Sequence, residues 1–252
     1  MSDFDRNVAA RGGFADRTAA VDAGLRAYML RVYNYMAAAV ALTGVVAYAT
    51  FNAAVVMDAS GKITALTPFG QTIFSGPLSI VLLLGTLGLV FFISFRINRL
   101  QYTTAMTLFM LYAALLGVTL SSIFLAYTGA SITRVFFISA ASFGALSLYG
   151  YTTQRDLSAM GSFMIMGLFG IIIASLVNIF LKSSGLDWAI SVIGVGVFAG
   201  LTAWDTQRIK EMYDSMDDDG TMGRKAIMGA LSLYLDFINL FLMLLRLVGD
   251  RR

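Results

Sequence analysis

The stretch GALSLYLDFINLFLMLLRLVG, Gly229–Gly249, places a single carboxylate inside an apolar run that is long enough to cross a membrane. That carboxylate, Asp236, lies eleven residues after Lys225, or ~16 Å further along a continuous helix. A charge near the centre of a spanning helix costs ~2.5–3.5 kcal/mol on insertion scales, so Asp236 is the first candidate for a functional residue. The alternative is a structural carboxylate that is hydrogen-bonded to neighbouring helices.

Five residues of this stretch recur at helical spacing and make one polar face on an otherwise apolar helix. They are Gly229, Ser232, Asp236, Asn239 and Met243. We expect this face to point into a bundle of helices, with Ser232 and Asn239 lining the same polar path as Asp236.

Six more apolar stretches precede this one. Of the 252 residues, 58% are hydrophobic and 13% are charged, whereas a soluble domain has about 45–50% and about 25%. The runs are too long for strands and lack a period-two alternation. The chain is therefore predicted to be an all-α integral membrane protein, with one seven-helix transmembrane domain at residues 28–252. The predicted spans are Tyr28–Phe51, Leu78–Phe95, Thr103–Tyr127, Ile132–Tyr151, Ser158–Leu181, Trp188–Arg208 and Met228–Val248.

Residues 1–27 differ from the rest of the chain because they are polar and carry four acidic and four basic side chains. A secretory signal peptide has a basic start and an apolar middle, and this segment has neither. We interpret it as a flexible, polar cytosolic tail, with a short interfacial helix as the alternative.

The distribution of Lys and Arg predicts the orientation in the membrane. Twelve basic residues fall in the N-terminal segment and on every second connection after it, against three on the other connections, so the N-terminus is predicted to be cytosolic. Seven full spans then leave Arg246, Arg251 and Arg252 outside, which conflicts with the rule. A re-entrant last segment would remove the conflict, but the final run is long enough to span and we favour a span.

Several kinds of chemistry are excluded by composition. The chain has no Cys and no His, which rules out disulfides, Cys/His zinc sites and histidine-based catalysis. The net charge of +3 is too small and too dispersed for a nucleic-acid partner. The lipid bilayer is the one partner that composition implies, and no cofactor is expected.

A second acidic residue, Asp205, lies in GLTAWDTQRIK (Gly200–Lys210), near the cytosolic end of the sixth predicted span. A surface ion pair with Arg208, three residues on, is an equally good interpretation of Asp205 alone. The sixth span ends where the seventh begins, so two carboxylates at similar depth on these antiparallel helices can face each other.

Two carboxylates in a low-dielectric site cannot both ionise without cost and titrate as a coupled pair. Asp205 and Asp236 could therefore share a proton, or bind a hard cation through their oxygens. Arg96 and Arg99, which open the third span on the same side, are candidate counter-ions. Alone, these arginines are better read as orientation anchors.

Two further patterns are interpreted as structural. Gly196 and Gly200, with Gly194 beside them, form a small-xxx-small pattern that predicts close helix packing. The segment DSMDDDG, Asp214–Gly220, is similar to the start of a calcium-binding EF-hand loop, but position twelve would be Ala226, where a Glu is needed. We interpret it as a solvated acidic turn.

The C-terminal third, LTAWDTQRIKEMY (Leu201–Tyr213) with Gly229–Gly249, resembles the bacterial branch of the Bax inhibitor-1 (transmembrane Bax inhibitor motif) family, also called the YccA family. FMLYAALLGVTLSSIF (Phe109–Phe124) and SLYGYTTQRDLS (Ser147–Ser158) match it too. The resemblance implies a last helix that is central and wrapped by the other six. It also implies a bacterial inner (plasma) membrane location.

The same resemblance implies a function that is not enzymatic. It implies a pH-sensitive calcium leak, gated by two aspartates that match Asp205 and Asp236, with calcium as the transported ion. An arginine that opens the third segment is implied as a partner of the pair; Arg99 matches it best, with Arg96 as the alternative.

Two other functions stay open. Resemblance to the same branch also allows a non-catalytic partner or modulator of a membrane protease or other quality-control machinery. A remote alternative is an intramembrane aspartyl protease, since two aspartates suit general acid–base attack by water. Leu-Tyr-Leu before Asp236, in place of Gly-x-Gly, and the absence of a later Pro-Ala-Leu argue against the protease.

Overall fold

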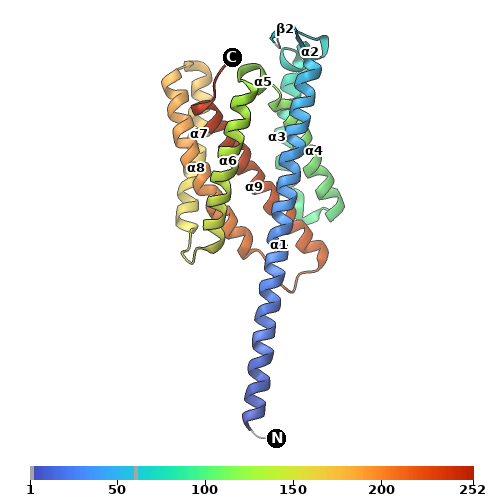
Figure 1. Ribbon diagram of the computed structural model, residues 1–252, viewed down its shortest axis with the longest axis vertical. Coiled ribbons are helices and arrows are strands. Elements are labelled where there is room, and N and C mark those ends of the chain that lie inside the picture. Colours follow the sequence, from blue (N-terminus) through green and yellow to red (C-terminus); the bar gives the residue numbers. More distant parts are fainter. Residues whose placement is uncertain (1–2, 60–61) are drawn as a thin grey trace.

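The computed structural model describes the backbone of residues 3–59 and 62–252, and side chains from residue 22 onward. Within these residues, seven helices are long and apolar enough to cross a membrane, and they run side by side (Figure 1). The predicted all-α membrane fold with seven spans is therefore confirmed. The elements are α1 (Asp3–Ala54), β1 (Val55–Met57), β2 (Ile63–Leu66), α2 (Pro68–Phe74), α3 (Pro77–Arg96), the 3-10 helix η1 (Ile97–Arg99), α4 (Tyr102–Leu120), α5 (Ile123–Ala126), α6 (Gly129–Thr152), α7 (Ser158–Leu181), α8 (Ser184–Glu211) and α9 (Asp219–Val248).

The predicted span boundaries agree with the helices to within a few residues, apart from the starts of the first and last. The fifth predicted span, Ser158–Leu181, is identical to α7. α9 begins at Asp219 rather than at the predicted Met228. The reason is a cap: the carboxylate of Asp218 accepts hydrogen bonds from backbone N–H groups of the first turn, which starts the helix in the polar segment before the apolar run.

The polar N-terminal segment was predicted to be a flexible tail, and in the structure it is helical from Asp3 onward. Figure 1 shows this part of α1 extending alone beyond the bundle. Alanine and arginine, which recur through residues 3–27, are among the best helix formers, and α1 runs without a break into the first span. The helix propensity of these residues therefore extends the first transmembrane helix into the segment that was predicted to be a flexible tail.

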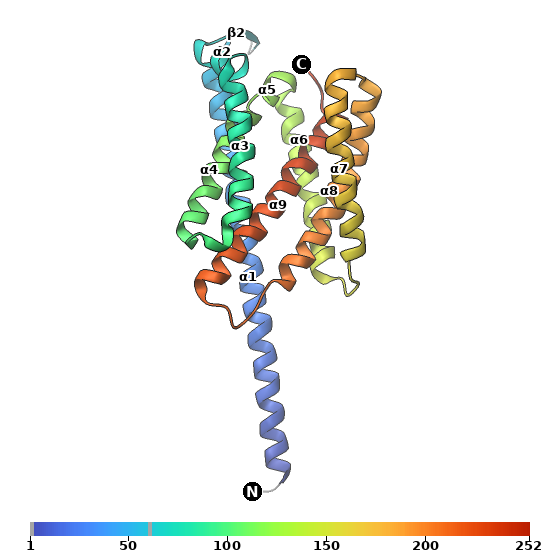
Figure 2. The ribbon, with the colours of Figure 1, turned by 180° about the vertical axis from the view of Figure 1, so that it is seen from behind.

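The connection between the first two spans holds structure that was not predicted. β1 pairs antiparallel with β2, and the short helix α2 follows, all at the end opposite the N-terminus (Figures 1 and 2). The signal was present in the β-branched residues of VVM and ITAL, which stand on either side of a short sequence that includes a glycine. Thr67 caps α2, and prolines Pro68 and Pro77 occupy the first turns of α2 and α3, where a missing N–H is tolerated.

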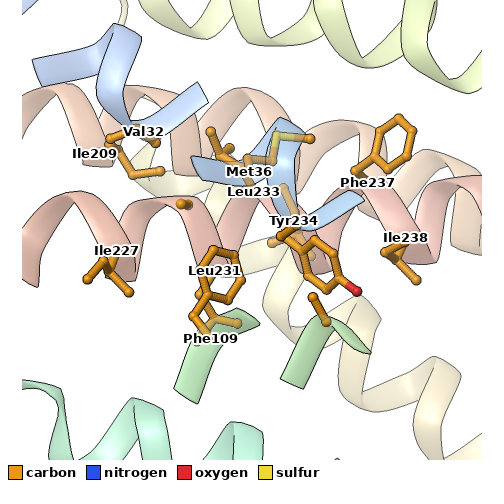
Figure 3. Close-up of a cluster of buried hydrophobic side chains, with 14 of the residues drawn as sticks. Val32, Met36, Phe109, Ile209, Ile227, Leu231, Leu233, Tyr234, Phe237 and Ile238 are labelled. Carbon is orange, nitrogen blue, oxygen red and sulfur yellow. The ribbon is translucent and has the colours of Figure 1, made fainter. Parts of the chain in front are cut away.

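α9 is the most buried of the seven spans, with 67% of its apolar window buried, against 11% for α3 and 6% for α7. It packs mainly against α1, α4, α6 and α8, while α3 packs on α4 and α7 packs on α8. Figure 3 shows side chains of α1, α4 and α8, among them Val32, Phe109 and Ile209, gathered around Leu231 and Tyr234 of α9. The prediction that all six other helices wrap the last one is not confirmed.

The last segment is a continuous 30-residue helix, which supports a full span over a re-entrant loop. Its C-terminal end lies at the same end of the molecule as β2 and α2 (Figure 2). Two of the three basic residues that conflicted with the orientation rule share one acidic partner there. Arg134 pairs with Asp250 at 3.0 Å, and Asp187 lies 3.7 Å from Arg246 and 4.0 Å from Arg251. The single carboxylate between Arg246 and Arg251 lowers the positive charge at this end, which weakens the conflict without removing it.

Small residues set the approach of α8 to its neighbours, but not as predicted. A Cβ on Gly194 would meet the Met243 side chain of α9 at 2.8 Å, and one on Gly200 would meet Met164 of α7 at 2.6 Å. A Cβ on Gly196 would meet nothing within 4 Å, so the predicted role of Gly196 in close packing is wrong. The contacts of α8 with α7 and α9 lie on two different faces, which a single i, i+4 pair cannot serve.

Candidate functional site

The polar face predicted on α9 points into the bundle, onto α8. A Cβ on Gly229 would meet the Ile209 side chain of α8 at 2.9 Å. One heptad further along α9, Asp236 faces Asp205, also on α8. A heptad beyond that lies Met243, against Gly194 of α8. Positions seven residues apart stay on one face of a packed helix, and this spacing brings the two carboxyl groups together.

The two carboxyl groups lie within hydrogen-bonding distance of each other. Asp236 is buried, with 5% of its surface exposed, and within the described part of the chain its Oδ2 atom has no hydrogen-bond partner. Asp205 is partly buried. Carboxylate oxygens only accept hydrogen bonds, so a bond between the two groups requires that one of them carries a proton. The pair is thus arranged to hold a proton or, when separated, to offer oxygen ligands to a cation.

Helix tilt makes this meeting possible. Asp205 lies ~9 Å from the end of α8, whereas Asp236 lies ~26 Å from the start of α9, at 1.5 Å rise per residue. α9 crosses the bundle diagonally (Figure 2), so a residue well inside α9 reaches the same level as one near the end of α8. The sequence correctly predicted neighbouring helices, but the match in depth depends on this tilt.

The arginines proposed as counter-ions are not at the pair. Arg96 and Arg99 are exposed, and no ion pair within 4.0 Å involves either of them among the residues with described side chains. The cation whose charge acts on Asp205 is Arg208, whose guanidinium stacks 5.4 Å over the Trp204 ring and forms no ion pair within 4.0 Å in the described structure. η1, the short 3-10 helix that carries Arg99, packs against α9.

The two residues predicted to line the path, Ser232 and Asn239, have different surroundings. Asn239 lines a cavity of about 390 Å³ between α7, α8 and α9, together with Phe198 and Met243, and its amide donates to the Leu235 carbonyl at 2.8 Å. Ser232 is half-buried. The structure thus places one polar side chain of this face in a cavity beyond Asp236, toward the C-terminal end of α9.

Hydroxyl groups beside the pair were not predicted. Thr206, the residue after Asp205, donates to the Thr202 carbonyl at 2.8 Å and lies 3.0 Å from the Ser147 hydroxyl, which lies 2.6 Å from the Tyr33 hydroxyl. These bonds join α1, α6 and α8 at the residue that follows Asp205. Single Ser, Thr and Tyr residues are common in membrane helices, so the sequence held no signal that these would meet.

Gln207, the residue after Thr206, also joins two segments through its side chain. Its side-chain oxygen accepts from the Leu157 N–H at 2.8 Å, and its amide donates to the Arg155 carbonyl at 2.8 Å. The turn between α6 and α7 is thereby fastened to the segment of α8 that carries Asp205.

The acidic turn provides the cap of α9 and one ion pair. Asp217 pairs with Lys225, and Asp218 caps α9. No group of three acidic residues able to hold a metal occurs in the described part of the chain. Side-chain and backbone hydrogen bonds from Thr221 hold the pKa of Asp218 below its ordinary value of 3.8, so this carboxylate stays charged at neutral and mildly acidic pH.

Comparisons with known proteins agree on one family. The family described as inhibitor of apoptosis-promoting Bax1 (Bax1-I) matches residues 25–252. An uncharacterized protein of Rickettsia prowazekii is 52% identical over 231 residues, 92% of each chain. The inner membrane protein YbhL of Escherichia coli is 49% identical over 232 residues, 91% of this chain and 94% of that protein. An uncharacterized protein of Caulobacter vibrioides is 43% identical over 259 residues and the full length of both chains.

Proposed function

This chain belongs to the Bax inhibitor family, and on that basis we propose that it is a pH-sensitive leak pathway for cations, with calcium as the ion that moves. The observation that carries the proposal is the contact between Asp205 and Asp236, two carboxyl groups on neighbouring membrane helices. In this proposal the pair is the gate, and the face of α9 that carries Ser232 and Asn239 lines the path.

The physical basis is the cost of two like charges in a low-dielectric site. When the pair shares one proton, it bridges α8 and α9 and the site is closed. When that proton is lost at higher pH, the carboxylates repel, and their oxygens become available to a hard cation such as calcium. Flux is therefore expected to rise with pH.

Calcium flux into liposomes that contain only the purified protein, measured from about pH 5 to about pH 8, tests the proposal. Flux that rises with pH and needs no partner protein is the expected result. Cleavage of a membrane substrate by the same preparation would favour an aspartyl protease. An absence of both flux and cleavage would favour a partner or modulator of a membrane protease. Cleavage, or the absence of both activities, would contradict the proposal of a leak pathway.

We also propose that the protein lies in a bacterial inner (plasma) membrane with its N-terminus in the cytosol. Since the chain has no cysteine, single-cysteine labelling reports one position at a time. Met216→Cys, in the acidic turn, where Met216 is 88% exposed, should resist an impermeant thiol reagent in intact cells. Lys62→Cys, in the connection between the first two spans, should react. Labelling in the reverse pattern would invert the orientation.

We propose in addition that Arg99 acts as a counter-ion to the ionised pair when the helices separate. Arg99→Ala should move the midpoint of the pH response of flux to higher pH by about one unit, because removing a cation makes the ionised pair less favourable. Arg96→Ala is the matched control, because Arg96 lies one helical turn away and is also exposed. A larger effect of Arg96→Ala would assign the role to Arg96, and equal, small effects would leave both as orientation anchors.

A further inference from the structure

A cavity of about 580 Å³ lies between α1 and α6, and neither aspartate lines it. Its walls are mostly apolar and aromatic, and one residue, Arg26, brings a charge to it. The lining residues are Arg26, Met29, Leu30, Tyr33, Phe143, Gly144, Ser147, Leu148 and Tyr151.

The cavity opens toward the membrane. Leu30 is 53% exposed and Leu148 is 63% exposed, on the spans that form its two walls, so the hydrocarbon of the bilayer reaches its edge. Gly144 has no side chain to fill the space beside α6, and a Cβ there would meet nothing within 4 Å. A lipid chain can therefore enter sideways, without any movement of the helices.

The interior of the cavity offers little to water. The hydroxyls of Tyr33 and Ser147 are bonded to each other, and Ser147 also contacts Thr206. A buried water needs about two to four polar partners, and these groups are already engaged. The walls otherwise consist of aliphatic and aromatic carbon, which suits an acyl chain.

The guanidinium of Arg26 is the charged group among the described residues that line the cavity. Among residues with described side chains, Arg26 forms no ion pair within 4.0 Å, although Asp22 lies one turn before it on α1. Lys210, the nearby base, is already engaged: its ammonium donates to the Tyr151 carbonyl at 3.0 Å and lies 5.3 Å over the Tyr151 ring. Among the described residues that line this cavity, Arg26 is thus the cation available to a ligand.

We propose that this cavity binds an anionic glycerophospholipid, with an acyl chain between α1 and α6 and the headgroup phosphate on Arg26. Basic residues between transmembrane helices at the membrane surface bind such headgroups, and a guanidinium matches a phosphate with two parallel hydrogen bonds. The apolar length of the cavity and the single cation at its mouth match the two parts of one lipid molecule. Neither feature requires that the protein conducts ions.

Native mass spectrometry of the purified, delipidated protein tests the site with phosphatidylglycerol and phosphatidylcholine of identical acyl chains. Phosphatidylglycerol should be retained more strongly. Arg26→Gln should reduce its retention about fivefold, since a basic residue near the surface contributes ~1 kcal/mol toward an anionic lipid, and should leave phosphatidylcholine unchanged. Gly144→Leu, which fills the cavity, should reduce the retention of both.

Matched variants control for nonspecific effects. Arg31→Gln removes a charge from the same helix outside the cavity, and Gly170→Leu adds the same side chain to α7, where a Cβ also meets nothing within 4 Å. Both should retain lipid as the unmodified protein does. Equal losses in Arg26→Gln and Arg31→Gln would overturn the proposal. So would glycerol phosphate without acyl chains competing as well as the lipid, since the ligand would then be a free phosphate. Arg26 is exposed, so its replacement leaves the packing intact even if Gly144→Leu fails to fold.

Discussion

Replacing either Asp205 or Asp236 with asparagine is expected to abolish the pH response of calcium flux in liposomes. Asparagine keeps the shape of the side chain but cannot lose a proton, so neither single variant can pass from a shared-proton pair to two carboxylates. A gate that opens on the loss of one proton changes by at most about tenfold per pH unit. Wild-type flux should therefore rise by about tenfold or more from about pH 5 to about pH 8, whereas each variant should vary by less than about twofold.

The double variant separates a pair from two independent groups. Asp205→Asn with Asp236→Asn should resemble either single variant, because two residues that act as one unit are not additive. A wild-type pH response that survives in both single variants would contradict the gate and return Asp205 to an interaction with Arg208. Asp218→Asn is the matched control, because that carboxylate stays charged throughout this range and its replacement should not change the pH response.

Gly150→Ala is expected to destabilise the protein strongly. A Cβ at Gly150 of α6 would overlap the backbone of Ala203 of α8, 2.9 Å from its carbonyl carbon, and backbone cannot rotate away as a side chain can. The two helices would have to separate, which would also stretch the 3.0 Å contact between Ser147 and Thr206. Overpacking of this kind costs about 1–3 kcal/mol, so the midpoint of thermal unfolding in detergent should fall by about 5 °C.

Gly144→Ala is the control on the same helix. A Cβ at Gly144 meets nothing within 4 Å, and alanine favours the helix by about 0.5–1 kcal/mol over glycine. Its thermal midpoint should stay the same or rise slightly, so the two substitutions should have opposite signs. Equal midpoints in the two variants would show that α6 and α8 do not approach at Gly150 as closely as the structure has them.

Local patterns predicted most of the fold. Hydrophobic length alone located all seven spans, because each needs about 20 apolar residues whatever its neighbours are. The polar face of α9 was also readable, since Asp236 and Asn239 recur at helical spacing in an apolar run. The N-terminal helix and the strand pair were missed, although alanine content and β-branched residues signalled them.

The geometry of the site was decided by contacts between helices. The diagonal course of α9 brings Asp236 to Asp205, and the close approach of α6 to α8 at Gly150 brings Ser147 to Thr206. The same packing leaves the cavity beside Arg26 open between α1 and α6 and pairs Arg246 with Asp187. The sequence by itself determined which segments enter the membrane and which face of each is polar, because these depend on residues a few positions apart. The tilt of the helices, and therefore which polar groups meet, was decided only in the tertiary structure, because it depends on how side chains from distant segments fill the space between them.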